Sequence, residues 1–139
     1  MSEQEVIEEE NGGIITCSPE FYDAIEDFSK HFKHRAALRE AARFSMSIGI
    51  ITNSREEKKD WKKGKPRTIA HLHGQFNDDG KFDYSMLFEM LDILDTQVPL
   101  NQLISEYVTG GMRWVVQNEM IDGNNFSILQ TEFPHLFED

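Results

Sequence analysis

The clearest pattern in the chain is an apolar stripe at helical spacing in its C-terminal third. The members of this stripe recur every three or four residues: Leu100, Leu103, Ile104, Tyr107, Val108, Gly111 and Val115. Such spacing predicts an amphipathic helix that packs one face against the rest of the protein. Gly110 and Gly111 lower helix propensity, which indicates either a close crossing by another helix or a bend. We expect this helix, ending near residues 122–123, to be the central packing element.

A strand and two helices are predicted near the N-terminal end. The β-branched run Ile14–Cys17 predicts one brief strand. Ser18 is then suited to cap a helix, because its hydroxyl can accept a hydrogen bond from a free backbone N–H, and Pro19 suits the first helical position. This helix should end near residues 31–32. A second helix is predicted over about 34–49, closed by its final glycine.

The remaining segments complete the predicted architecture. A third helix is predicted over about 82–95, and residues 68–73 are a candidate for a short extended piece. The fold class is therefore mainly α, with one short N-terminal strand followed by about four helices. At 139 residues and 39% apolar content, a single domain over residues 14–139 is expected. Residues 1–13, which contain five glutamates, are expected to form a flexible acidic tail.

The composition also limits the setting. Cys17 is the only cysteine, so no internal disulfide can form, and a cytoplasmic location is expected. No apolar run approaches the roughly 18 residues that span a bilayer, and no membrane partner is expected.

The sequence has no P-loop, no His-Glu-x-x-His pair and no serine elbow. A non-catalytic protein without a cofactor is the prediction. Carboxylates such as Glu89 and Asp92 leave an enzyme as an alternative, although such residues usually form the wet face of a helix.

One pair of histidines has the spacing of metal ligands. His71 and His73 alternate, which would place both imidazoles on one face of a strand. A third ligand would have to come from His31, His34 or a carboxylate near Asp78, and nothing in the spacing makes them converge. No metal site is therefore predicted.

Positive charge is concentrated in one segment. Twelve of the fourteen Lys and Arg residues fall between Lys30 and Arg67, together with only four acidic residues, whereas the whole chain has a net charge of −11. The segment itself therefore carries +8. A field of one sign at one surface attracts a partner of the opposite sign.

Two parts of this segment are candidates to hold a phosphate backbone. Arg35, Arg39 and Arg43 recur every four residues and should stack along one edge of the second helix, facing away from the core. Residues 53–67, here called the basic loop, carry five lysines around Trp61 and are expected to be exposed. The predicted nucleic-acid contacts are Lys33, Arg35, Arg39, Arg43, Lys58, Lys59, Trp61, Lys62, Lys63, Lys65 and Arg67.

Both parts also have a simpler interpretation. The arginines can pair with Glu40 within their own helix. The loop lysines can pair loosely with Glu56, Glu57 and Asp60, or with the acidic surface of a neighbouring subunit. The sequence leaves these alternatives open.

The order of strand, helix and helix resembles the ribbon-helix-helix DNA-binding unit. The resemblance covers IITCSPEF (14–21) and RAALREAARF (35–44). In that family two protomers pair their strands into a ribbon that enters the major groove, and the second helix begins at a phosphate. The resemblance implies a homo-oligomer with residues 33–35 at the phosphate. A lone strand of four residues needs such a partner. The strand departs from the family in that only Thr16 could read a base.

A longer resemblance is to small accessory proteins of bacterial DNA phosphorothioation (Dnd) systems, of the DndE-like type. It rests on FKHRAALREAARFSMSIG (32–49) and EYVTGGM (106–112), in the same order, and covers about residues 14–137. It implies a DNA-linked role in a modification or anti-phage operon. The acidic tail and the net charge of −11 depart from a simple DNA binder.

Two functions follow from these patterns. The first is a non-catalytic DNA-associated accessory protein of a DNA-modification or anti-phage defence system, which contacts phosphates through the basic helix edge and loop. The second is a protein-interaction adaptor whose basic patch docks an acidic partner of the same operon without touching DNA. Either would be expected to form a homo-oligomer through the strand or the fourth helix.

Overall fold

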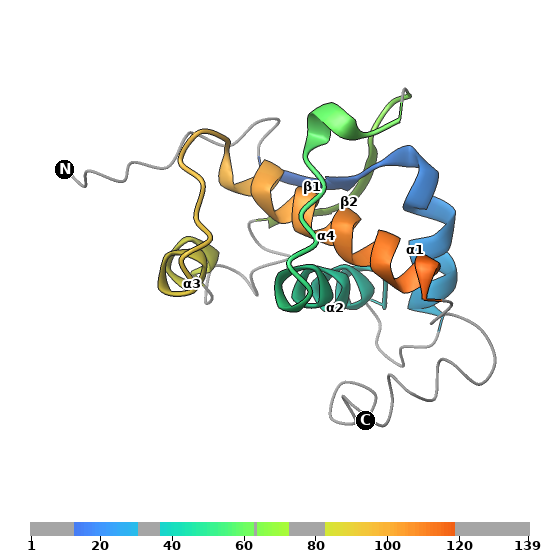
Figure 1. Cartoon of the computed structure of the whole chain (residues 1–139). Coiled ribbons are helices and arrows are strands. Elements are labelled where there is room, and N and C mark those ends of the chain that lie inside the picture. Colours follow the sequence, from blue (N-terminus) through green and yellow to red (C-terminus); the bar gives the residue numbers. More distant parts are fainter. Residues whose placement is uncertain (1–12, 31–36, 63, 73–82, 119–139) are drawn as a thin grey trace.

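The computed structural model describes residues 13–30, 37–62, 64–72 and 83–118, which form a mainly helical fold with a small two-stranded sheet (Figure 1). The elements are β1 (Ile14–Cys17), η2 (Pro19–Phe21), α1 (Tyr22–Ser29), α2 (Ala37–Ile51), η3 (Lys58–Asp60), β2 (Arg67–His71), α3 (Tyr84–Met90) and α4 (Leu100–Gln117). The predicted fold class, mainly α with a short N-terminal strand followed by helices, is confirmed.

Helix α4 is the centre of the fold. It crosses α2 and packs against β1 (Figure 1). All the members of its predicted apolar stripe are buried. The two helices meet at glycines: a Cβ atom on Gly49 would overlap the carbonyl oxygen of Tyr107, and one on Gly111 would overlap that of Ser45. Gly111 therefore marks a close crossing, whereas a Cβ atom on Gly110 would overlap the carbonyl oxygen of Ser54 in the segment after α2. Phe28 of α1 and Phe44 of α2 close the core with an edge-to-face ring contact of 5.6 Å between centroids.

Strand β1 pairs with β2 of the same chain. The pairing is antiparallel, with Ile14 opposite His71 and Cys17 opposite Arg67, and the register shifts between Ile15 and Thr16. The extended piece suspected at residues 68–73 is thus the second strand. Because β1 has a partner within its own chain, the argument that it needs a second protomer no longer holds.

The other edge of β1 faces polar side chains of α4. The backbone nitrogen of Thr16 donates to Ser105 Oγ (2.9 Å), and that of Ser18 donates to Thr109 Oγ1 (3.3 Å). Asn101 Nδ2 donates to the carbonyl oxygen of Ile14 (2.9 Å). These three side chains satisfy backbone groups that an edge strand would otherwise leave open. Both edges of β1 are therefore occupied within one chain.

Several helix ends differ from the predictions. Ser18 precedes the short η2, but its buried hydroxyl makes no cap and has no hydrogen-bond partner among the described residues. Helix α2 continues past Gly49 to Ile51, and Asn53, with φ of 54°, takes the left-handed conformation after it. The predicted third helix is shorter than expected, because Asp92 adopts φ of 59° soon after Met90.

Some predictions fall outside the described residues. These are the acidic tail up to residue 12, the start of the second predicted helix within 31–36, and the chain beyond residue 118, whereas α1 ends at Ser29, before the predicted 31–32. In the part of the chain that the structure describes, no helix combines the length and apolar content needed to cross a bilayer.

Candidate nucleic-acid interface

The basic loop is attached to α4 by one buried carboxylate. Glu106, whose side chain is 2% exposed, accepts hydrogen bonds from Arg55 Nε (2.7 Å), the Lys58 backbone nitrogen (2.9 Å) and Gln102 Nε2 (3.0 Å). Its carbonyl oxygen also accepts from the backbone nitrogen of Glu56 (3.1 Å). A charge is stable in such a place only when it is paired and hydrogen-bonded. Glu106 therefore fixes the first half of the loop to the core.

Arg55 joins this anchor to a second carboxylate. Its Nη2 lies 2.9 Å from Asp95 Oδ2. Burial alone would lower the pKa of Arg55, but the hydrogen bonds and charges of Glu106 and Asp95 raise it above its ordinary value. The backbone N–H of Gln97, followed by Arg55, holds the pKa of Asp95 below its ordinary value, partly opposed by burial. Arg55 thus carries its charge inside the fold and is not available to a phosphate.

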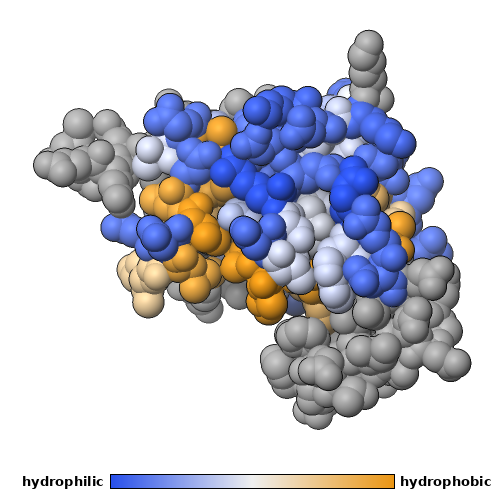
Figure 2. All heavy atoms as spheres, in the orientation of Figure 1, coloured by the Kyte–Doolittle hydropathy of each residue, from blue (hydrophilic) through white to orange (hydrophobic). Residues whose placement is uncertain are grey.

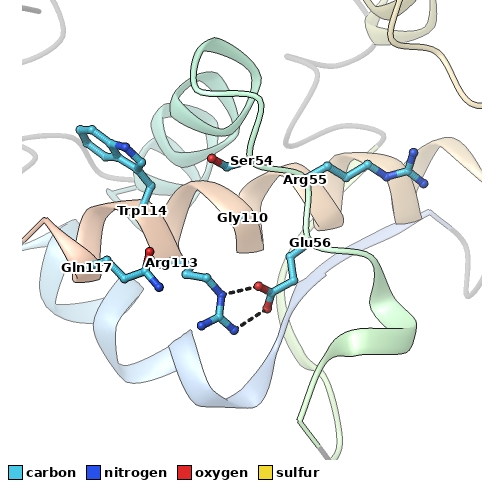
Figure 3. Close-up of a pocket in the computed structure, with 7 residues that line it drawn as sticks. All are labelled: Ser54, Arg55, Glu56, Gly110, Arg113, Trp114 and Gln117. Atoms are coloured by element: carbon cyan, nitrogen blue, oxygen red, sulfur yellow. Dashed lines mark hydrogen bonds and ion pairs between the residues drawn. The ribbon is translucent and has the colours of Figure 1, made fainter.

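A second ionic cluster holds the loop from the other side. Arg113 of α4 donates to both carboxylate oxygens of Glu56, through Nε and through Nη2 (2.9 Å), as Figure 3 shows. Its Nη2 also lies 3.2 Å from Glu20 of η2. The hydrogen bond to Glu56 is the main reason that the pKa of Arg113 is raised. Lys62 Nζ reaches Glu20 as well, at 3.4 Å. This cluster links the loop to η2 and α4.

Three loop lysines, Lys59, Lys62 and Lys65, are exposed at the surface. Lys59 is 76% exposed and pairs with Glu57 at 3.1 Å, a contact that raises the pKa of Lys59. Lys62 is 72% exposed in its pair with Glu20. Surface ion pairs of this kind are weak and exchange readily with other anions. Lys65 is exposed and has no ion pair among the described residues.

Two aromatic rings support the loop. Trp61 is half-buried, and its indole Nε1 donates to the carbonyl oxygen of Glu56 (3.0 Å). One edge of the indole is therefore engaged within the loop. Arg67, at the start of β2, lies over the ring of Tyr22, with Cζ 4.0 Å from its centroid. Sequence reasoning gave Trp61 and Arg67 only a role toward nucleic acid, whereas the structure gives each a packing role.

The predicted arginine row on α2 is partly embedded. Arg43 Nη1 lies 3.0 Å from Glu40 Oε1, and Arg39 Nε lies 3.9 Å from the same oxygen. The side chains of Arg39 and Arg43 are only 29% and 20% exposed, so this edge of α2 is less open to a partner than expected. Pairing with Glu40, the simpler interpretation, is what the structure shows. Three more predicted contacts, Lys33, Arg35 and Lys63, lie outside the described residues.

A small hollow opens beside the anchors. It has a volume of about 140 Å³ and is lined by Ser54, Arg55, Glu56, Gly110, Arg113, Trp114 and Gln117 (Figure 3). Pockets for small-molecule ligands usually exceed roughly 300 Å³. Among its lining residues, Arg113 pairs with Glu56, and Arg55 pairs with Glu106 and Asp95 outside the hollow, so each of its charged groups already has a partner. The hollow is better explained by the loop's attachment than by substrate binding.

The suspected metal ligands are not described. His73 and the side chain of His71 fall outside the described residues, and the remaining described His, Cys, Asp and Glu form no group of three suited to a metal. Cys17 is fully buried, and burial raises the pKa of its thiol to about 12, opposed by the charge of Arg67.

The anchoring residues were missed by sequence reasoning. The available signal was Glu106, a charged residue set among Leu103, Ile104 and Tyr107 in the buried stripe of the fourth helix. Arg113 and Glu20 gave no comparable signal, because their partners come from distant parts of the chain. No protein-family model, curated protein or solved structure matches the chain.

Proposed function

We propose that this chain is a non-catalytic DNA-associated accessory protein that holds the phosphate backbone with the lysines of its basic loop. The observation that carries this proposal is the position of Lys59 and Lys62. Their amines stand at the surface, 76% and 72% exposed, in weak pairs that a phosphate can displace. The resemblance of residues 32–49 and 106–112 to Dnd accessory proteins is the basis for placing the chain in a bacterial DNA-modification or anti-phage defence system.

The attachment of the loop supports the proposal. Residues 53–67 contain seven Lys and Arg residues and three acidic residues, a net charge of +4. Glu106 and Arg113 fix the base of the loop, so less conformational freedom is lost when its lysines meet a ligand. Arg55 is engaged in this anchoring through its ion pairs with Glu106 and Asp95. The contact surface therefore consists of the exposed Lys59, Lys62 and Lys65, the half-buried Lys58 and, from the sequence, Lys63.

A second function, an adaptor for an acidic protein, is favoured by one observation. The described partners of Lys59 and Lys62 are carboxylates, those of Glu57 and Glu20. A carboxylate-rich partner segment would offer the same groups. In this case the loop would bind protein, and DNA would not compete.

Titration of the purified chain separates the two functions. Short duplex, nicked duplex and single-stranded DNA are compared with a polyglutamate peptide at about 50 mM salt. The first function is supported if the chain binds DNA and the logarithm of the binding constant falls linearly with the logarithm of the salt concentration. For duplex DNA the expected slope is about −0.9 per phosphate contact. Binding of polyglutamate without DNA binding supports the adaptor.

The matched variants are Lys59→Gln with Lys62→Gln, and Lys30→Gln as control. Lys30 is equally exposed and pairs with Asp27 (3.3 Å), but lies at the end of α1 outside the loop. The double variant should reduce the salt slope by about two phosphate contacts, whereas the control should not change it. Equal DNA binding by the double variant and the wild type would refute the role of the loop.

A further inference from the structure

Helix α3 is apolar on two faces. Tyr84 and Phe88 are buried on the inner face, where the Phe88 ring meets Tyr107 with 5.8 Å between centroids. Met86 and Met90, four residues apart on the outer side, are 55% and 77% exposed, and Leu91 after the helix is also exposed. A surface helix normally turns a polar face to water. Contiguous exposed apolar side chains mark an interaction site.

The apolar surface extends beyond the helix. Figure 2 shows hydrophobic atoms gathered over α3 and continuing toward α2, beside a band of hydrophilic atoms. Ile51, the last residue of α2, is 68% exposed. We call the surface formed by Met86, Met90 and Leu91 the α3 face.

The rim of the α3 face is acidic. Asp83, Glu89 and Asp92 are exposed, and none of them has an ion pair among the described residues. Asp83 caps α3 by accepting from the Met86 backbone nitrogen (3.0 Å), so its carboxylate lies next to the first methionine. No Lys or Arg occurs between residues 82 and 112. A partner that binds this face should therefore present an apolar surface flanked by positively charged residues.

This charge argues against the two ends of the chain as occupants. Residues 1–13 and 119–139 each contain five acidic residues and no Lys or Arg, so both would meet like charge at the rim. Pairing of α3 with α3 of a second copy would likewise bring two acidic rims together. The basic loop of a second copy has the right charge, but residues 53–67 present no large exposed hydrophobic side chain within the described part.

We propose that the α3 face binds an amphipathic helix of another protein, with apolar residues along one side and Lys or Arg at its edges. Methionine suits this role, because its flexible side chain adapts to differing apolar surfaces. The apolar side of the incoming helix would lie on Met86, Met90 and Leu91. Its basic residues would reach Asp83, Glu89 and Asp92. Recognition would rest on apolar residues at helical spacing, with charge setting the choice of partner.

A designed peptide tests the proposal. The probe is a Leu/Lys peptide of about four helical turns with leucines at helical spacing, labelled for fluorescence anisotropy at physiological ionic strength. A peptide of the same composition, with its leucines out of helical spacing, measures binding by charge alone. The amphipathic peptide should bind the intact chain at least about tenfold more tightly than the scrambled one.

The variants locate the site. Met86→Gln with Met90→Gln keeps the length and helix propensity of both side chains, and should weaken binding of the amphipathic peptide about tenfold. Val116→Gln, at an exposed apolar position near the end of α4, is the control and should bind like the wild type. Since the altered side chains are exposed, the helical circular dichroism of the double variant should equal that of the wild type. Glu89→Gln with Asp92→Asn should reduce the salt dependence of binding.

Three outcomes would overturn the proposal. These are equal binding of the scrambled peptide, equal binding by the double methionine variant, and self-association of the wild type that the same variant abolishes. The last would mean that a second copy covers the α3 face. The test is separate from that of the basic loop, since α3 and η3 lie on different sides of the molecule (Figure 1). Lys59→Gln with Lys62→Gln should leave peptide affinity at or above the wild-type value.

Discussion

Gly111 of α4 faces Gly49 of α2 so closely that a Cβ atom on Gly111 would lie 3.0 Å from the Gly49 backbone nitrogen and would overlap the carbonyl oxygen of Ser45. Both obstacles are backbone atoms, which cannot rotate aside as a side chain can. The distance between the two central helices is therefore set by the absence of a side chain at this point. The packing of the core and the attachment of the basic loop both depend on this helix-to-helix distance, because α4 contacts each of them.

The variant Gly111→Ala should be destabilised by at least about 2 kcal/mol. Alanine favours a helix by about 1 kcal/mol relative to glycine, but the overlap with Ser45 outweighs this gain. Urea unfolding followed by helical circular dichroism measures the change. Ser47→Ala, on the exposed side of α2, should change stability by less than about 0.5 kcal/mol. A Gly111→Ala protein as stable as the wild type would contradict the crossing described.

The variant Glu106→Gln should lower the free energy of unfolding by about 3 kcal/mol. The carboxylate accepts from Arg55, the Lys58 backbone and Gln102, whereas an amide turns its NH₂ group toward one of these donors. Urea unfolding at neutral pH is the measurement. Glu57→Gln, which removes a charge from an exposed pair, should have almost no effect. Equal and small losses in both variants would show that Glu106 is not an anchor.

Asp95 should make stability depend on acid pH. The Gln97 N–H and Arg55 lower the pKa of Asp95 in the folded protein, so the folded state binds this proton less readily than the unfolded chain. Its stabilising contribution is present above the unfolded pKa of about 4 and is lost as pH falls through the folded pKa. Asp95→Asn should therefore destabilise the protein at about pH 7 and much less at about pH 3. Urea midpoints at the two pH values test this, and a deficit independent of pH would contradict it.

Cys17 should be unreactive in the native protein. Its thiol is fully buried and has its pKa raised to about 12, so almost no thiolate is present near pH 8. We expect reaction with an aromatic disulfide reagent at least about a hundredfold slower than in the chain unfolded by guanidinium. Absorbance of the released thiolate measures both rates. Fast reaction of the folded protein would show that β1 opens readily.

The loop lysines should contribute to DNA affinity without sequence preference. Replacing Lys58, Lys59, Lys62 and Lys63 with glutamine should weaken binding by a similar factor for every duplex sequence, because phosphate contacts carry no base information. Competition among duplexes of different sequence provides the comparison. A loss confined to one sequence would point instead to base contacts.

The parts of the fold that could be predicted depend on local spacing. The stripe of α4 and the strand at Ile14–Cys17 follow from residues within a few positions of one another, whereas the glycines of α4 left a close crossing and a bend as alternatives. Amphipathic periodicity carries this information because one side of an element must be buried. The predicted end of α2 was wrong. Glycine often ends a helix, but Gly49 lies inside α2, where it allows the close approach of α4.

The parts that could not be predicted depend on distant polar groups. Ser105 and Thr109 occupy the buried side of α4, where sequence alone gives no reason to expect acceptors for β1. The candidate site shows the same limit. The excess of lysine was visible in the sequence, but the use of Arg55 and Arg113 as internal anchors depends on carboxylates brought in by tertiary structure.

The hydrogen bonds from β1 to α4 join residues 87 to 91 positions apart in the chain. Strand β1 therefore cannot form its native hydrogen bonds until the ribosome has synthesised α4. Contacts of such long sequence separation slow folding and leave early segments exposed meanwhile. The chain is therefore expected to fold only after residue 118 has emerged, and shortened products that end before α4 should be degraded instead of accumulating.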